Sequence, residues 1–195
     1  MDLLMGLMIG VGLSAACGFR VFVPMLGMSI ANLAGHLTLS PGFEWIGTWP
    51  TLIALATATI LEIIAYYIPW VDNIMDTVAT PAAVVAGTIV TASQLGDVSP
   101  LLKWSLAIVA GGGASSAIQA STVVARTAST GTTGGLGNFA VSSLELFSAI
   151  LITLLAIVLP VIGLLVMFAI LSVMACLAAK VSWSRKPYPM SPERR

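Results

Sequence analysis

The chain has 195 residues, of which 58% are hydrophobic and only 8% are charged. A soluble globular domain carries roughly 25% charged residues, so this composition excludes a protein whose whole surface faces water. The formal net charge of zero argues against a nucleic-acid partner. The sequence therefore predicts an integral membrane protein with the lipid bilayer as its solvent.

Six apolar segments follow one another along the chain, and a bilayer core requires about 20 apolar residues per helix. We expect helical spans at residues 3–33, 52–69, 73–93, 101–125, 139–159 and 161–179. The first segment is longer than one straight span needs, and Pro24 or Gly27 is the expected point of a kink or break. This pattern predicts an all-α transmembrane bundle.

The chain is predicted to form one transmembrane domain, residues 1–180, followed by a basic tail, residues 181–195. Five of the eight basic residues lie in or after the last span: Lys180, Arg185, Lys186, Arg194 and Arg195. Because positive charge favours the cytoplasmic side, the C-terminus should be cytoplasmic, and six spans would place the N-terminus there too. The N-terminus lacks the basic region of a signal peptide, so we interpret it as retained.

A faint internal repeat relates the two halves. GLSAA at residues 12–16 resembles GASSA at 113–117, and Pro69 follows the second span as Pro160 follows the fifth. Three spans per copy would invert the second copy, a plan that recurs in secondary transporters. The alternative is coincidence among small and apolar residues. The repeats would cover residues 1–95 and 101–180.

Small residues four apart predict close packing of the first and fourth spans. The rows are Gly12, Ala16, Arg20 and Pro24; Gly6, Gly10, Ser14 and Gly18; and Gly113, Ala117, Ser121 and Ala125. Helix packing alone explains such rows, without a ligand.

Ionisable residues inside the spans are costly, about 2.5 to 3.5 kcal/mol each at mid-helix. Glu62 and Arg20 stand out most. They form either a structural ion pair or a pair that binds substrate or a proton, and both interpretations stay open. We expect both side chains to face the bundle interior and Arg20 to approach Glu62 or Asp76.

Four further residues complete the candidate binding set: Asp72, Asp76, Arg126 and Glu145. Asp72 suits a helix cap, and Asp76 could be stabilised by the positive end of the helix dipole. For Asp76, which is followed by Thr77, Thr80 and Pro81, we favour a functional role. Arg126 and Glu145 flank the Gly- and Thr-rich stretch at residues 127–138 and could be solvated at the interface. That stretch could hold an anion on backbone N–H groups, but a flexible cytoplasmic turn is the simpler interpretation.

The sequence gives little support for a disulfide, a metal site or an enzymatic active site. Cys17 and Cys176 lie in apolar runs without disulfide or metal spacing, and the single histidine, His36, makes a metal site improbable. The sequence contains no nucleophile–base constellation, so we expect no enzymatic activity, no metal and no cofactor.

Several motifs together resemble a bacterial membrane family, domain of unknown function 4126. They are GFRVFVP at 18–24, Glu62, IPWVD at 68–72, Asp76, TPAA at 80–83 and TGTTGGLGN at 130–138. The resemblance covers roughly residues 5–180 and implies a polytopic protein of the bacterial inner membrane, without an assigned activity. The family pattern has a proline near Asn138, where this chain has Phe139.

The leading hypothesis is a small transporter or channel for an unknown solute or ion. Arg20 would bind an anionic group or hold the carboxylates ionised, and Glu62 or Asp76 would carry a coupling proton. The alternative is a membrane scaffold in which the same charges form structural pairs. A chain of this size is expected to form a homo-oligomer in order to enclose a pathway.

Overall fold

The computed structural model describes residues 2–68 and 71–184, without the side chains of 73, 174, 175 and 177–184. These ranges are helical and contain no strand. The α-helices are α1 Leu3–Phe19, α2 Phe22–Leu33, α3 Trp49–Tyr66, α4 Val71–Gln94, α5 Pro100–Leu106, α6 Gly113–Thr133, α7 Asn138–Val158 and α8 Pro160–Ser184. A 3-10 helix, η1 (Glu44–Gly47), precedes α3, and a π-helix, η2 (Ala107–Gly112), joins α5 to α6.

Four stretches are long and apolar enough to cross a membrane. They are Trp49–Tyr66, Ile74–Gln94, Pro100–Thr133 and Asn138–Val158. Large apolar side chains cover the outside of the bundle, among them Ile53, Leu61, Ile74, Leu144 and Leu165. Such a surface suits lipid and not water, so the predicted all-α, membrane-like character is confirmed.

The first apolar segment breaks at Arg20. The prediction of a break at Pro24 or Gly27 is therefore wrong. Arg20 has an extended backbone, with φ −145° and ψ 120°, and α2 begins two residues later. Pro24 lies in the first turn of α2, where its missing N–H removes no helical hydrogen bond. The proline therefore accompanies the start of a new helix.

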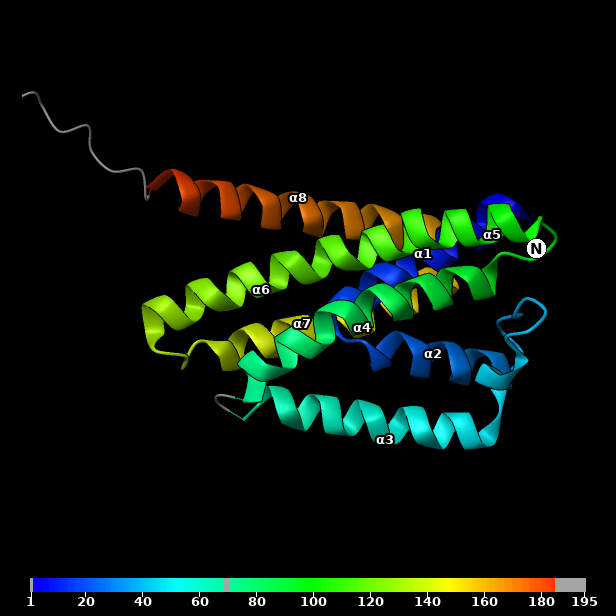
Figure 1. Ribbon diagram of the computed structural model, residues 1–195, viewed down its shortest axis with the longest axis horizontal. Helices are drawn as coiled ribbons and strands as arrows, with labels where there is room; N and C mark the ends of the chain where they lie inside the picture. Colours follow the sequence, from blue (N-terminus) through cyan, green and yellow to red (C-terminus); the bar gives the residue numbers. More distant parts are fainter. Residues whose placement is uncertain (1, 69–70, 185–195) are drawn as a thin grey trace, which may run out of the picture.

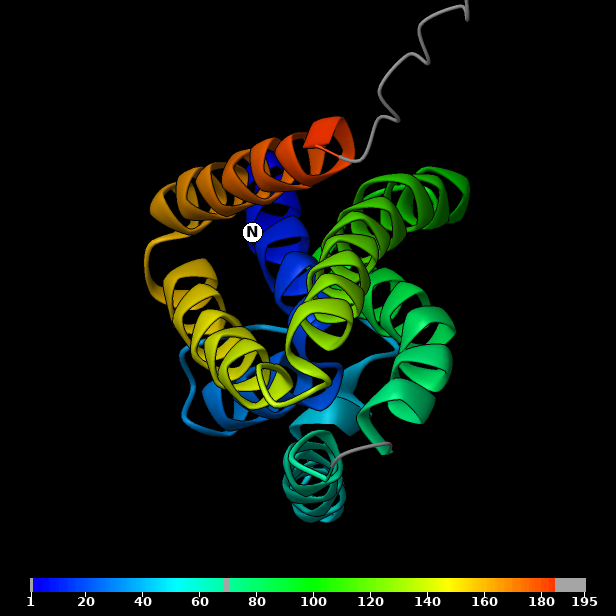
Figure 2. The same ribbon diagram turned by 90° about the vertical axis from the view of Figure 1, so that its left-hand side faces the viewer.

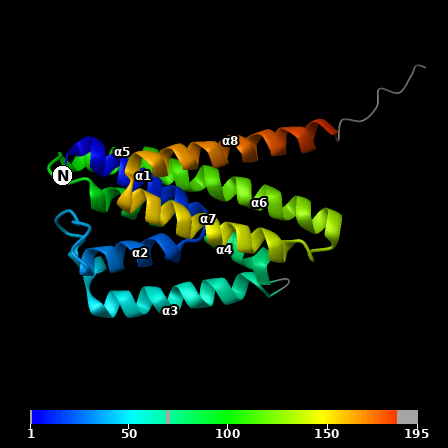
Figure 3. The ribbon, with the colours of Figure 1, turned by 180° about the vertical axis from the view of Figure 1, so that it is seen from behind.

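The two helices that flank this break form a re-entrant hairpin. Gly10 of α1 packs against Thr91, and Met28 of α2 lies 3.4 Å from the Ser93 hydroxyl, so both helices reach the same level of α4. Figures 1 and 3 show α1 entering the bundle and α2 returning towards the same end. The first apolar segment thus does not cross the bundle.

The hairpin changes the predicted topology. The start of α1, the 34–48 connection and the turn before α5 lie at one end, which we call the N-terminal end (Figure 1). The end of α3, the start of α4, the α6–α7 connection and the last turn of α8 lie at the opposite end. The start of α1 and the last turn of α8 thus lie at opposite ends of the bundle, whereas six full spans would place them at the same end. The membrane side of each terminus stays a prediction. The basic tail lies almost wholly outside the described residues.

Helix α1 forms the centre of the bundle, with the other long helices around it (Figure 2). Every residue from Gly12 to Phe19 is buried. A Cβ added to Gly18 would lie 2.6 Å from Cβ of Ile118 in α6, so the predicted close approach of the first and fourth spans is confirmed. The predicted row on α6 is wrong, since Gly113 and Ala117 are exposed. The face of α6 that packs inward carries Ser115, Ile118, Gln119, Thr122 and Arg126.

Helix α6 extends to Thr133, through most of the stretch predicted as a loop. The hydroxyl groups of Thr127 and Thr133 donate to the carbonyls of Val123 and Ser129, each one turn earlier, at 2.8 Å. These bonds allow threonine to continue the helix instead of ending it. Gly134 then ends α6 with φ 64°, a left-handed conformation that glycine adopts without strain.

The internal repeat stays a prediction. The serines that it aligns, Ser14 and Ser115, do meet at one point, because a Cβ on Gly87 would lie within 2.7 Å of both hydroxyl oxygens. Pro69, the other marker of the repeat, lies outside the described residues.

Candidate functional site

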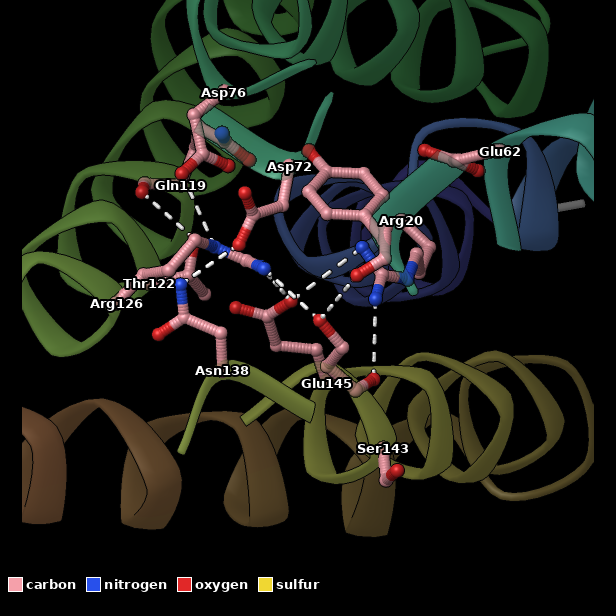
Figure 4. A network of polar contacts seen from close by, with 12 residues as sticks. Arg20, Glu62, Asp72, Asp76, Gln119, Thr122, Arg126, Asn138, Ser143 and Glu145 are labelled. Carbon is pink, nitrogen blue, oxygen red and sulfur yellow. Dashed lines mark hydrogen bonds and ion pairs between the residues drawn. The ribbon is translucent and has the colours of Figure 1, made fainter. Parts of the chain in front are cut away.

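All six candidate residues lie in the half of the bundle away from the N-terminal end. Arg20 occupies the tip of the hairpin, Glu62 lies on α3, Asp72 and Asp76 lie on α4, Arg126 lies on α6 and Glu145 lies on α7. Figure 4 shows Arg20, Arg126 and Glu145 pointing towards one another. Five of the six are at most 4% exposed, and Asp76 is partly buried.

Four charged side chains form a continuous chain across the bundle. The Arg20 Nη1 atom lies 3.4 Å from Oε2 of Glu145, and the Arg126 Nη2 atom donates to the same oxygen. Arg126 Nε lies 3.1 Å from Oδ2 of Asp76. We call Arg20, Glu145, Arg126 and Asp76 the charge chain. The interpretation of Arg126 and Glu145 as solvated residues is wrong, since they are 1% and 4% exposed.

Glu62 faces inward as predicted, but it does not pair with Arg20. Its two carboxylate oxygens accept hydrogen bonds from the backbone N–H groups of Val21 at 2.7 Å and Phe22 at 3.1 Å. These donors open α2, where no helical carbonyl can accept from them, and a carboxylate also suits the positive end of a helix dipole. Glu62 therefore caps the re-entrant helix, and the predicted approach of Arg20 to Glu62 or Asp76 is replaced by its ion pair with Glu145.

Tyr66 lies against both guanidinium groups. The Cζ atoms of Arg20 and Arg126 lie 3.8 Å and 4.6 Å from the centre of its ring. A π face attracts cations more strongly where water is excluded. Tyr66 lies one turn after Glu62 on α3 and is not among the six candidate residues.

Ser142 was not identified from the sequence, although it contacts both arginines. Its hydroxyl accepts from Arg126 Nη1 at 2.9 Å and donates to the Tyr66 carbonyl at 3.3 Å, while its carbonyl accepts from Arg20 Nη2 at 3.1 Å. Serine is common in membrane helices as a packing residue, so no local pattern distinguished this one.

Asp72 is buried and connects α4 to the start of α7. The Asn138 amide donates to Asp72 Oδ2 at 2.7 Å and to the Thr130 hydroxyl at 3.0 Å. Asp72 thus lies between the charge chain and the α6–α7 turn. Next to it, a cavity of about 240 Å³ is lined by Tyr66, Tyr67, Asp72, Gly134, Gly135, Leu136, Asn138 and Phe139.

Several buried polar atoms of the cluster have no hydrogen-bond partner among the described residues. They are Arg20 Nε, Glu145 Oε1, Asp76 Oδ1 and Gln119 Nε2, whereas Arg20 Nη1 and Arg126 Nε have only the ion-pair contacts given above. Buried polar groups in proteins are nearly always satisfied by protein, water or ligand. Donors and acceptors that converge without partners therefore mark a place that can hold water or a small polar ligand.

The site offers hydrogen-bond donors and charge, but no metal-binding set of side chains. No group of three His, Cys, Asp or Glu residues that could hold a metal ion occurs in the described part of the chain. Cys17 is buried, Cys176 is exposed and both are free thiols. The arrangement can bind an ion or a polar solute at membrane depth.

Comparison with protein families matches residues 7–180 to the family described as Domain of unknown function (DUF4126). The charge chain, Glu62 and Ser142 all fall inside the matched range. No curated protein and no solved structure matches the chain. The chain, with its motifs around Arg20, Asp72 and Asn138, therefore belongs to the family of domain of unknown function 4126.

Proposed function

We propose that this protein is a small transporter or channel whose substrate is an anion. The observation that carries the proposal is a buried pair of guanidinium groups, Arg20 at the hairpin tip and Arg126 on α6, that shares one carboxylate oxygen of Glu145. Arg20 Nε and Glu145 Oε1 beside them have no hydrogen-bond partner among the described residues. Broken helices whose ends meet at membrane depth recur at the binding sites of secondary transporters. Irregular backbone at that depth is tolerated where it is buried or lines a cavity.

The proposed pathway starts at the cavity beside Asp72 and Asn138. Tyr66 lines this cavity and also contacts both arginines, so it connects the opening to the charge chain. The basic tail after α8 favours the cytoplasmic side for this end of the bundle. The six apolar segments would then form five crossings and one hairpin, with the N-terminus outside.

A scaffold role is the second candidate, and one observation favours it. Glu62 uses both oxygens to cap α2, so at least one intramembrane charge has a structural task. In a scaffold the charge chain would only fix the helices in register.

Flux measurements in reconstituted liposomes separate the two candidates. We expect liposomes that contain the protein to release trapped nitrate, chloride or acetate down a gradient faster than protein-free liposomes. Arg126→Gln should slow release at least about tenfold, the effect of losing roughly 1.4 kcal/mol of anion binding. Lys103→Gln, at a cation near the N-terminal end, is the matched control and should leave the rate unchanged. Equal release from protein-containing and protein-free liposomes for all three anions would favour the scaffold.

A further inference from the structure

One carboxylate oxygen serves two guanidinium groups. Oε2 of Glu145 lies 3.4 Å from Arg20 Nη1 and accepts from Arg126 Nη2, while Oε1 has no partner among the described residues. A carboxylate between two arginines can accept up to four hydrogen bonds, two at each oxygen. Glu145 therefore leaves much of the hydrogen-bonding capacity of this position unused.

The surrounding side chains are held in place independently of Glu145. Arg20 Nη2 donates to the Ser142 carbonyl, Arg126 Nη1 donates to the Ser142 hydroxyl, and both guanidinium groups lie against the Tyr66 ring. Arg20 and Arg126 are each 1% exposed. The donors would thus remain close together if the glutamate side chain left or lost its charge.

Glu62 and Glu145 differ in this respect, although both are buried glutamates. Both oxygens of Glu62 are bonded to backbone N–H groups that cannot move without opening α2. Glu145 is bound only through side chains, and only through one oxygen. Glu145 is therefore the carboxylate that an outside anion can replace.

Ionisable groups from every packed element face this position. Arg20 comes from the hairpin tip, Tyr66 from α3, Asp76 from α4 and Arg126 from α6. Glu62 of α3 points to the start of α2 and Asp72 of α4 points to Asn138, while residues 160–175 of α8 include no ionisable side chain. If Glu145 takes up one proton as one monovalent anion binds, the total charge of the cluster does not change. Anion binding then adds no net negative charge to the buried cluster.

We propose that Glu145 occupies, as a built-in ligand, a binding site for a small planar oxyanion of the carboxylate or nitrate type. The anion takes the place of the Glu145 carboxylate between Arg20 and Arg126 when Glu145 is protonated. This inference rests on the proposed function and names the substrate class and the proton carrier of the same site. It replaces Glu62 and Asp76 as the predicted carriers.

Binding of nitrate to the purified protein in detergent tests the inference without requiring transport. Nitrate stays ionised throughout the accessible pH range, so any pH dependence belongs to the protein. For Glu145→Ala, about 100 mM nitrate should raise the unfolding temperature by about 5 °C or more at both pH 5 and pH 8. The native protein should gain stability from nitrate at pH 5 and little at pH 8.

Three further variants provide the controls. Glu44→Ala, at an exposed glutamate near the N-terminal end, should behave like the native protein. Glu145→Gln keeps the side-chain size and should bind nitrate equally at both pH values, which preserves the test if the alanine variant does not fold. The double variant Glu145→Ala with Arg126→Gln should lose the nitrate effect.

Each outcome decides the question. If nitrate stabilises neither the native protein at pH 5 nor either Glu145 variant, Glu145 is not a replaceable ligand and the inference fails. Stabilisation of the variants alone, with no response of the native protein at any pH, would make Glu145 a permanent structural partner and also overturns it. Nitrate binding without flux in liposomes would support the anion site at Glu145 and contradict the transport function. Flux without nitrate binding would support transport and contradict the anion site at Glu145.

Discussion

The two halves of the bundle hold polar groups at membrane depth in different ways. Towards the N-terminal end, α1, α4 and η2 approach closely through Gly10, Gly87 and Gly111, and neutral hydroxyls bridge them. In the other half the charge chain joins helices that are distant in sequence. Among the described residues, both halves contain buried polar atoms without a hydrogen-bond partner. In the neutral half these atoms include Gln94 Oε1, whereas in the charged half they include atoms of ionisable side chains, Arg20 Nε, Glu145 Oε1 and Asp76 Oδ1. The comparison indicates that the first half stabilises the fold and that the second can bind a ligand.

Cysteine labelling tests on which side of the membrane each end of the bundle lies, and each site should react either fully or not at all. With Cys17 and Cys176 replaced by alanine, single cysteines at Asp2, Glu44 and Asp97 should react with an impermeant reagent from outside. A cysteine at Leu136, which is 88% exposed in the α6–α7 turn, should react only after the membrane is permeabilised. Labelling of Asp2 and Leu136 from the same side would contradict the re-entrant hairpin.

The largest energetic effect should come from the charged half. Glu145→Ala leaves two buried guanidinium groups without their shared carboxylate, so the free energy of unfolding should fall by about 3–5 kcal/mol. Denaturant unfolding in mixed micelles measures this change. Asp97→Ala, at an exposed carboxylate, should change it by no more than about 0.5 kcal/mol. Similar values for both variants would mean that the charge chain stabilises nothing.

Glu62 should show an intermediate effect, because its partners are backbone groups. Glu62→Ala leaves the N–H groups of Val21 and Phe22 buried without an acceptor, at a cost of about 1–3 kcal/mol for each group. Glu62→Gln keeps one acceptor oxygen and should lose less. Hydrogen exchange should accelerate at the first turn of α2 in the alanine variant. Unchanged exchange there would exclude the capping role.

In the neutral half, Gly87→Ala tests close packing. A Cβ at this position would lie 2.5 Å and 2.7 Å from the hydroxyl oxygens of Ser115 and Ser14, so the helices must move apart. We expect a loss of about 1–3 kcal/mol in unfolding free energy, the usual cost of overpacking. The response to nitrate should stay as in the native protein, and its loss would show that the halves are not separable.

The smallest effect is expected for a single neutral hydrogen bond. Ser14→Ala removes a bond from the hydroxyl to the Gly87 carbonyl at 2.5 Å. Hydrogen bonds between membrane helices contribute about 0.6 kcal/mol on average. A loss above roughly 2 kcal/mol in the same unfolding assay would show that the neutral half depends on this bond and not on close packing.

The sequence determined the features that depend on composition and local chemistry. Low charge and long apolar segments predicted a helical membrane protein, and costly intramembrane charges identified Arg20, Glu62, Asp76 and the other candidates before any coordinates. The later apolar segments form helices close to their predicted bounds, except that α6 continues past residue 125 to Thr133. The threonine-rich stretch was misassigned, because its hydroxyls satisfy the carbonyls of its own helix.

Tertiary structure alone decided which charges pair and where the first segment turns back. The break at Arg20 exists because the Glu62 carboxylate, some forty positions later in the chain, accepts the N–H groups that a continuous helix would have satisfied. Arg20 pairs with Glu145 and not with Glu62, because its guanidinium group lies against α7, where it meets the Ser142 carbonyl and the Glu145 carboxylate. An ionisable residue inside a span needs a polar or charged partner, and the sequence alone shows that need. Which residue becomes the partner depends on how distant helices pack, and hydropathy contains no information about this packing.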